Sequence, residues 1–146
     1  MEWLKAIIDY GIIGLLIVLS VVAVGIAIER GLFFKRVRIE DFTSKRELEL
    51  ALTRKLHLIA TVGSNAPYLG LLGTVLGIML TFATMGQEGM MDSARIMTGM
   101  SLALKATAVG LMVAIPSVTL YNLLLRRAKE LLMKWDIRNG NGREGV

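Results

Sequence analysis

The sequence predicts an all-α membrane protein with three transmembrane helices and cytoplasmic helical extensions. Three observations lead to this fold class: 54% of the 146 residues are hydrophobic, the chain contains three long runs with at most one charge each, and basic residues cluster beside these runs. A helix of about 20 apolar residues crosses the hydrocarbon core of a bilayer. We therefore expect residues 1–146 to form a single membrane domain.

The composition excludes several classes of protein. A chain without cysteine has no disulfide, no thiolate nucleophile and no cysteine metal site. The net charge of +5 does not predict nucleic-acid binding, because the basic residues lie where membrane topology and anionic membrane lipids place them. No spanning run combines an acid, a base and a metal ligand, so we expect neither an enzyme nor a bound cofactor or metal.

The first transmembrane helix is predicted at about residues 8–28, which include an uncharged run long enough to span. This run leads directly into Glu29 and Arg30. It lacks the small-residue cleavage site of a secretory signal, so we expect it to be retained. Its branched apolar residues surround the helix on all sides, which predicts a helix that faces lipid.

Residues 29–57 are predicted to form a short cytoplasmic region. Their mixed charges with interspersed apolar residues are typical of an amphipathic helix. Thr43 and Ser44, followed by Glu47, form a capping signal that starts a helix in the second half of this region.

The second transmembrane helix is predicted at about residues 58–86. Steps of four and three residues place small, hydroxyl-bearing and helix-bending residues on one face: Gly63, Pro67, Gly70, Thr74, Gly77, Thr81 and Thr84. Small residues allow helix backbones to approach closely inside a bilayer. This face therefore predicts contact with protein or with a pore. Gly73 and Gly77, four residues apart, form a second row of small residues beside it. Pro67 removes one helical hydrogen bond and predicts a kink.

A periplasmic loop is expected at residues 87–95, and the third transmembrane helix at about residues 96–125. This helix carries a similar face: Ala103, Thr107, Gly110, Ala114, Ser117 and Tyr121. Two matching faces predict two partner helices. Pro116 predicts a bend. The tail, residues 126–146, is expected to be cytoplasmic, with a disordered glycine-rich end.

The distribution of basic residues predicts a periplasmic N-terminus and a cytoplasmic C-terminus. Residues 86–95 contain one basic residue, whereas the chain from residue 126 onward contains six. Lysine and arginine in short loops remain on the cytoplasmic side of the membrane.

Thr74 and Thr107 are predicted to lie at the same depth, near the middle of the bilayer. Each is eleven residues from its end of the hairpin, Met85 or Ile96, which is roughly 16 Å at 1.5 Å per residue. The spanning runs contain no Asp or Glu, and hydroxyl groups hold no charge near neutral pH. If this protein conducts protons, a partner supplies the titrating carboxylate.

Lys105 is the one charged residue inside the third run. Ionisable residues inside a membrane are functional candidates by default, which makes Lys105 a candidate intramembrane charge partner. The alternative is that its long stem carries the ammonium to the headgroups, since Lys105 lies about nine residues from the end of the run.

Two stretches, SNAPYLGLLGTVLGIM and LALKATAVGLMVAIPSVTLYN, resemble the MotA/TolQ/ExbB proton-channel family, and most closely its ExbB branch. The resemblance is specific over about residues 61–122. It implies a multi-pass protein of the bacterial inner membrane that forms a homo-oligomer, a pentamer in this family. The oligomer would surround an ExbD-like single-span protein whose membrane aspartate carries the proton, and a TonB-like protein would pass on the work.

The resemblance also implies roles for single residues. Thr74 and Thr107 match pore-facing threonines on the proton pathway, and Pro67 matches a proline in the inner part of the second helix. Many family members carry a glutamate three residues before the position of Lys105, where this chain has Leu102. This departure raises the interest of Lys105 as a partner of the ExbD-like aspartate or of a neighbouring subunit.

The function expected from these observations is that of a proton-channel or motor subunit. It would couple the proton-motive force to energised transport across the outer membrane, such as siderophore or vitamin uptake. Three alternatives stay open: a TolQ-like subunit for envelope maintenance, a non-conducting scaffold for a single-span partner, and a holin-like protein that conducts without a partner.

Overall fold

The computed structural model describes residues 2–89 and 92–140 of the chain. Its elements are α1 (Glu2–Arg36), the short 3-10 helix η1 (Ile39–Asp41), α2 (Lys45–Thr53), α3 (Leu56–Glu88) and α4 (Ser93–Arg138). Three of these helices, α1, α3 and α4, are long and apolar enough to cross a membrane. The predicted all-helical fold class with three spans is therefore confirmed.

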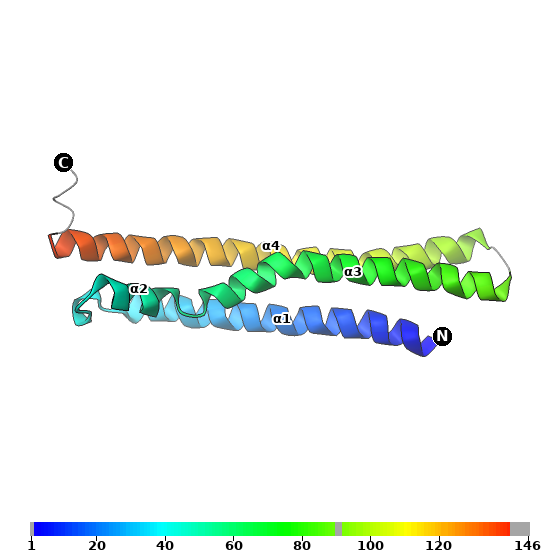
Figure 1. The fold of residues 1–146 in the computed structure, drawn as a ribbon, viewed down its shortest axis with the longest axis horizontal. Helices are drawn as coiled ribbons and strands as arrows, with labels where there is room; N and C mark the ends of the chain where they lie inside the picture. Colours follow the sequence, from blue (N-terminus) through cyan, green and yellow to red (C-terminus); the bar gives the residue numbers. More distant parts are fainter. Residues whose placement is uncertain (1, 90–91, 141–146) are drawn as a thin grey trace.

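The helices form an elongated bundle. Figure 1 shows α1, α3 and α4 running side by side along the long axis, with α3 and α4 joined as a hairpin. The N-terminus and the hairpin turn lie at one end of the bundle. Helix α2 and the C-terminal part of α4 lie at the other end, which we call the basic end because it carries most of the lysine and arginine.

The membrane part of the bundle has a core to which each long helix contributes one stripe. The buried residues are Leu16, Ala23 and Ala27 of α1, Leu56, Ile59, Val62 and Ala66 of α3, and Val113 and Ala114 of α4. Much of the remaining surface of α1 is open, since Ile17 and Val21 are 54% and 67% exposed. The first helix thus contacts protein along a narrow stripe and presents its other sides outward.

A second core lies at the basic end. It joins Phe34 of α1, Leu48 and Leu52 of α2, and Ala128 and Trp135 of α4. Helix α4 has 46 residues, about 69 Å at 1.5 Å per residue, which is more than twice the ~30 Å hydrocarbon core. The second core therefore belongs to the helical extension outside the membrane, where Lys45 and Asp136 form an ion pair at 2.7 Å.

The helix ends differ from the predicted spans. Helix α1 begins at Glu2 and continues to Arg36, and α4 continues through most of the predicted tail to Arg138. Charged residues mark where a helix leaves the hydrocarbon, but backbone hydrogen bonding continues past them. Part of the predicted periplasmic loop (90–91) and the end of the tail, predicted to be disordered (141–146), lie outside the described residues.

The predicted capping signal is confirmed at the start of α2. The Ser44 hydroxyl accepts a hydrogen bond from the backbone N–H of Glu47 at 3.2 Å. Thr43 Oγ1 donates to the Glu47 carboxylate at 3.1 Å. The Ser44 contact satisfies one backbone donor that the first helical turn leaves unpaired, and the Thr43 contact holds the Glu47 side chain beside it.

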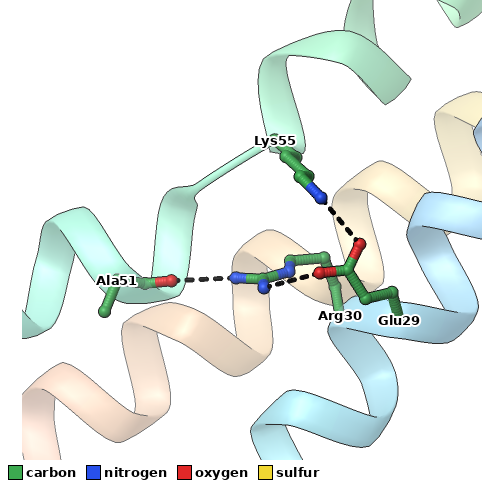
Figure 2. Close-up of polar contacts among 4 residues, drawn as sticks. All are labelled: Glu29, Arg30, Ala51 and Lys55. Atoms are coloured by element: carbon green, nitrogen blue, oxygen red, sulfur yellow. Dashed lines mark hydrogen bonds and ion pairs between the residues drawn. The ribbon is translucent and has the colours of Figure 1, made fainter.

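A group of polar contacts, the Arg30 cluster, ties α1 to the turn between α2 and α3 (Figure 2). Arg30 is only 5% exposed, and its Nη1 donates to the Ala51 carbonyl at 2.9 Å, near the C-terminal end of α2. Nη2 of Arg30 donates to Glu29 at 3.1 Å, and Lys55 Nζ donates to the other Glu29 oxygen at 3.0 Å. The cluster therefore holds α2 and the start of α3 against the end of α1.

Lys55 lies at the point where the chain turns from α2 into α3. Its φ of 65° is the one positive φ among the described residues other than glycine, a conformation that side chains rarely adopt. The ion pair of Lys55 with Glu29 accompanies this turn.

Glu29 lies just beyond the predicted membrane-crossing residues 8–28. Hydrogen bonds from Lys55 and Arg30 hold the pKa of Glu29 below its ordinary value. A carboxyl group with a lowered pKa stabilises the folded state above its ordinary pKa, and this contribution is lost as the pH falls through the lowered value. The two bonds to Glu29 therefore contribute to stability at neutral pH and lose this contribution in acid, whereas the bond from Arg30 to the Ala51 carbonyl does not depend on Glu29.

We predict that Arg30→Met loosens α2. The variant keeps an apolar stem but removes the charged donor to Ala51, and such a bond contributes about 1.5–3 kcal/mol. Amide hydrogen exchange within α2 should be about tenfold faster or more. Lys35→Met, at an exposed lysine on the same helix, is the control and should exchange like the parent protein. Equal exchange in the two variants would contradict an anchoring role for Arg30.

Candidate functional site

Helices α3 and α4 touch through their backbones at Gly70 and Gly110. A Cβ atom on Gly70 would lie 2.7 Å from the Ala106 carbonyl oxygen and 3.1 Å from Gly110 Cα. A Cβ atom on Gly110 would lie 2.7 Å from the Ala66 carbonyl oxygen. Only a residue without a side chain fits at either position, so the two glycines allow the close approach expected of membrane helices.

Gly73 and Gly77 extend this contact along α3. A Cβ atom on Gly73 would lie 2.7 Å from the Ala106 side chain and 3.3 Å from Ile12 of α1, so three helices meet there. A Cβ atom on Gly77 would lie 2.8 Å from the side chain of Ala103. The two rows of small residues predicted from the sequence thus pack against α4 and α1.

Thr74 and Thr107 lie inside this contact, within hydrogen-bond distance of each other. Thr74 Oγ1 also lies 3.0 Å from the Ala103 carbonyl oxygen and 3.3 Å from that of Gly70. Thr107 Oγ1 lies 3.4 Å from the Gly70 carbonyl oxygen. Thr74 is 7% exposed, and Thr107 is half-buried. The direct contact agrees with the equal depth expected from counting residues along the hairpin.

The threonine pair forms a short hydrogen-bonded chain with two arrangements. Each hydroxyl has one proton and can accept further hydrogen bonds. In one arrangement Thr107 donates to Thr74, which donates to the Ala103 carbonyl; in the other Thr74 donates to Thr107, which donates to the Gly70 carbonyl. Switching between the two reverses the direction of the chain. Hydroxyl groups hold no charge near neutral pH, so any proton passed along this chain would have to be bound by a separate group.

The two small-residue faces predicted from the sequence pack on each other within one chain. Their buried members are Gly63, Gly70, Thr74, Ala103, Gly110, Ala114 and Ser117. Each helix is therefore the partner of the other, and much of the surface that the sequence assigned to partner helices is used inside the hairpin. The threonine hydroxyls face this protein contact and not lipid.

Both prolines lie inside continuous helices. Pro67 is part of α3 and Pro116 is part of α4. Pro67 follows buried Ala66 and is half-buried, whereas Pro116 is exposed between buried Ala114 and Ser117.

Lys105 projects away from the threonine pair. It is exposed and forms no ion pair within residues 2–89 and 92–140. Two residues of helix turn through about 200°, so Lys105 and Thr107 lie on nearly opposite sides of α4. Its charge therefore points toward lipid or toward another molecule.

Arg30 is an anchor that the sequence pattern does not reveal, since its charge belongs to the mixed-charge region predicted at residues 29–57. The neighbouring aromatic residue was a usable signal: the Arg30 guanidinium lies 4.4 Å from the Phe33 ring centroid. An arginine one helical turn from an aromatic residue can stack on its ring, and this cation–π contact helps to stabilise the buried guanidinium.

The similarity to known proteins covers the residues of this site. A model described as the MotA/TolQ/ExbB proton channel family matches residues 21–137, which include the threonine pair and the glycine contact. The biopolymer transport protein ExbB of Aquifex aeolicus is 54% identical over 96% of this chain and 95% of its own length.

Two further relatives match different shares of the chain. A putative biopolymer transport protein ExbB-like 2 of Helicobacter pylori is 58% identical over 92% of this chain and 89% of its own length. The Tol-Pal system protein TolQ of Pseudomonas aeruginosa is 41% identical over 60% of this chain and 38% of its own length.

We predict that Gly70→Ala destabilises the protein, because the new methyl group would meet the Ala106 backbone, which cannot move independently of α4. Overpacking of this kind costs about 1–3 kcal/mol. Thermal unfolding in detergent, followed by circular dichroism, measures the effect. The control is Gly14→Ala, where a Cβ atom has no neighbour within 4 Å and alanine is the better helix former. Similar melting of the two variants would argue against the glycine contact.

Proposed function

The chain belongs to the MotA/TolQ/ExbB proton channel family, and from this premise we propose that it is the multi-span subunit of a proton-driven motor in the bacterial inner membrane. The three apolar helices support the location. The proposed motor couples the proton-motive force to transport across the outer membrane, with siderophores or vitamins as the class of cargo.

The observation that carries the proposal is the buried threonine pair. Thr74 and Thr107 bring two hydroxyls and two backbone carbonyls, those of Gly70 and Ala103, into one connected group, at a depth that the count of residues predicts to be near mid-membrane. Hydroxyls are seldom buried among apolar helices without a function or a packing reason. Here they form a relay whose direction can reverse, which is the property that proton transfer requires.

The proposal needs a partner that binds the proton. The three spanning runs contain no Asp or Glu, so the chain has no carboxylate at the depth of the threonine pair. An ExbD-like single-span protein with one membrane aspartate would supply it. Thr107, the more exposed member of the pair, is the residue that we propose to exchange a proton with this aspartate, directly or through water.

We further propose a homo-oligomer, with five copies as the family resemblance implies, around the partner helices. Large apolar residues are exposed on all three spanning helices, which leaves surface for both lipid and neighbouring copies. The basic end, with α2 and the end of α4, lies in the cytoplasm in this proposal, and the N-terminus lies in the periplasm.

The system served by the motor is proposed to be TonB-like. Similarity to the ExbB protein of Aquifex aeolicus covers 95% of that protein, whereas similarity to TolQ of Pseudomonas aeruginosa covers 38%. Some ExbB proteins are covered over as small a share of their length, 36% in Neisseria gonorrhoeae, so the support comes from the relatives that match over nearly their whole length. These carry ExbB names, which favours an ExbB-like role with a TonB-like partner over a TolQ-like role in envelope maintenance.

Two other functions make different predictions in reconstituted vesicles. A non-conducting scaffold would bind its single-span partner without proton flux. A holin-like protein would conduct without any partner. The proposed motor shows flux driven by a pH gradient only when the partner is present and only when its aspartate is intact.

We predict that Thr74→Val lowers this partner-dependent flux by at least about tenfold, the factor that corresponds to about 1.4 kcal/mol, or one lost hydrogen bond. Valine has nearly the shape of threonine but no hydroxyl. Thr74→Ser keeps the hydroxyl and should retain most of the flux. A pH-sensitive dye inside proteoliposomes measures the rate.

The matched control is Thr119→Val. Thr119 is exposed on α4, and its hydroxyl donates to Ile115 of the same helix at 2.9 Å. This variant should conduct like the parent protein. If Thr74→Val and Thr119→Val conduct equally, the threonine pair is a packing feature and the relay is ruled out.

A separate prediction concerns Lys105. Lys105 and Thr107 lie on nearly opposite sides of α4. We therefore expect Lys105→Met to leave the flux within about threefold of the parent. This factor corresponds to an interaction energy of about 0.6 kcal/mol, typical of exposed charges. A much larger loss in the same vesicles would instead identify Lys105 as a charge partner of the aspartate or of a neighbouring copy.

A further inference from the structure

A cavity of about 590 Å³ lies between α1, α3 and α4 at the end of the bundle that holds the N-terminus and the hairpin turn. Helix α1 meets α3 where Ile12 lies beside Gly73. The cavity opens from this point toward the N-terminus, and its α1 residues run from Asp9 to Glu2. It is separate from the Arg30 cluster, which lies at the opposite end of α1.

The lining changes from charged to small along the length of the cavity. Five charged residues line it toward the end of the bundle: Glu2, Lys5, Asp9, Glu88 and Arg95. Thr81 and Thr84 follow along α3, and the lining ends at Gly77 and Ala103. Apolar side chains, Ile8, Leu80, Met85 and Leu102, complete the lining. The cavity is therefore amphipathic, with charged groups toward the end of the bundle and small residues at the contact between α3 and α4.

The threonines present hydrogen-bond acceptors to the cavity. Thr81 Oγ1 donates to the Gly77 carbonyl at 2.9 Å, and Thr84 Oγ1 donates to the Leu80 carbonyl at 2.8 Å. Because each hydroxyl has a single proton, only its lone pairs remain for a molecule in the cavity. Water and hydrated protons donate to such acceptors, whereas a lipid chain cannot.

The charges also favour positive ions. Arg95 is paired with Glu88, which leaves the carboxylates of Glu2 and Asp9 with the single ammonium of Lys5 among the charged lining residues. Of the two acids that line the cavity from α1, Asp9 is half-buried and lies closer to the inner end than Glu2. A cavity with acceptor lone pairs and a net negative lining attracts hydrated protons and small cations.

The inner end of the cavity meets the threonine pair. Ala103 lines the cavity, and its carbonyl accepts the hydrogen bond from Thr74 at 3.0 Å. Gly77, the other residue at this end, follows Thr74 by about one helical turn. A molecule at the inner end therefore lies next to the relay.

We propose that this cavity, which we call the vestibule, holds water and admits hydrated protons or small cations from the membrane surface to the threonine pair within each subunit. The passage of protons from the vestibule to the threonine pair rests on the proposed function. The presence of water in the vestibule does not, and it can be measured without any proton flux. At about 30 Å³ per molecule, the vestibule has room for roughly twenty waters.

Cysteine labelling tests the proposal, because the parent chain has no cysteine. Thr81→Cys and Leu80→Cys place a thiol in the vestibule lining. Phe82→Cys and Met79→Cys are the controls; these side chains are 50% and 61% exposed outside the vestibule at neighbouring depths. Each variant is prepared in the complete complex in membrane vesicles, and a membrane-impermeant methanethiosulfonate is added to one side or the other.

Vestibule cysteines should react at least about tenfold faster than the controls, since the reactive thiolate forms where water solvates it and is suppressed in apolar surroundings. Reaction no faster than in the controls, from either side, would overturn the proposal and indicate that lipid or a neighbouring helix fills the cavity. Fast reaction only from the cytoplasmic side would support hydration but contradict the proposed orientation.

The charge of the reagent tests the preference for cations. A trimethylammonium reagent should label Thr81→Cys severalfold faster than a sulfonate reagent of the same reactivity, and Asp9→Asn should reduce this ratio. Equal rates for the two reagents would overturn the cation preference. A hydrated vestibule combined with normal flux in Thr74→Val would mean that the relay has failed while the vestibule stands.

Discussion

The backbone contact of α3 and α4 at Gly70 and Gly110 is the constraint on which the rest of the structure depends. In lipid, apolar side chains gain nothing by burial, so helices associate through close packing and through polar groups that would otherwise be unpaired. The missing side chains bring the two backbones together. This approach brings the Thr74 hydroxyl to the Ala103 carbonyl of the other helix.

The same constraint explains why the hydroxyls form a pair. Thr74 and Thr107 are each hydrogen-bonded across the helix contact as well as to each other, so neither is an unpaired polar group in hydrocarbon. The pair is hydrogen-bonded in either of two arrangements, which stabilises it, and the proposed function uses the same two arrangements to pass protons. The same hydrogen bonds therefore serve both the stability of the helix contact and the proposed function.

The bundle also separates two physical environments. The membrane core is built from small and branched residues in narrow stripes, whereas the core at the basic end uses larger residues such as Phe34 and Trp135. Water drives burial in the second core but not in the first. Arg30 lies at the boundary, where a buried guanidinium can pair with a helix C-terminus and with Glu29.

The sequence by itself determined the three spans, the start of α2 and the equal depth of Thr74 and Thr107, because these follow from local properties: run length, capping and a rise of about 1.5 Å per residue. Only the tertiary structure decided that the two small-residue faces pack on each other, that Arg30 is buried, and that a cavity opens beside Asp9. These features depend on which side of one helix meets another. The contacts that set them join residues far apart in the sequence, from 21 positions for Arg30 and Ala51 to 61 positions for Ile12 and Gly73, and helical periodicity identifies a face without naming its partner.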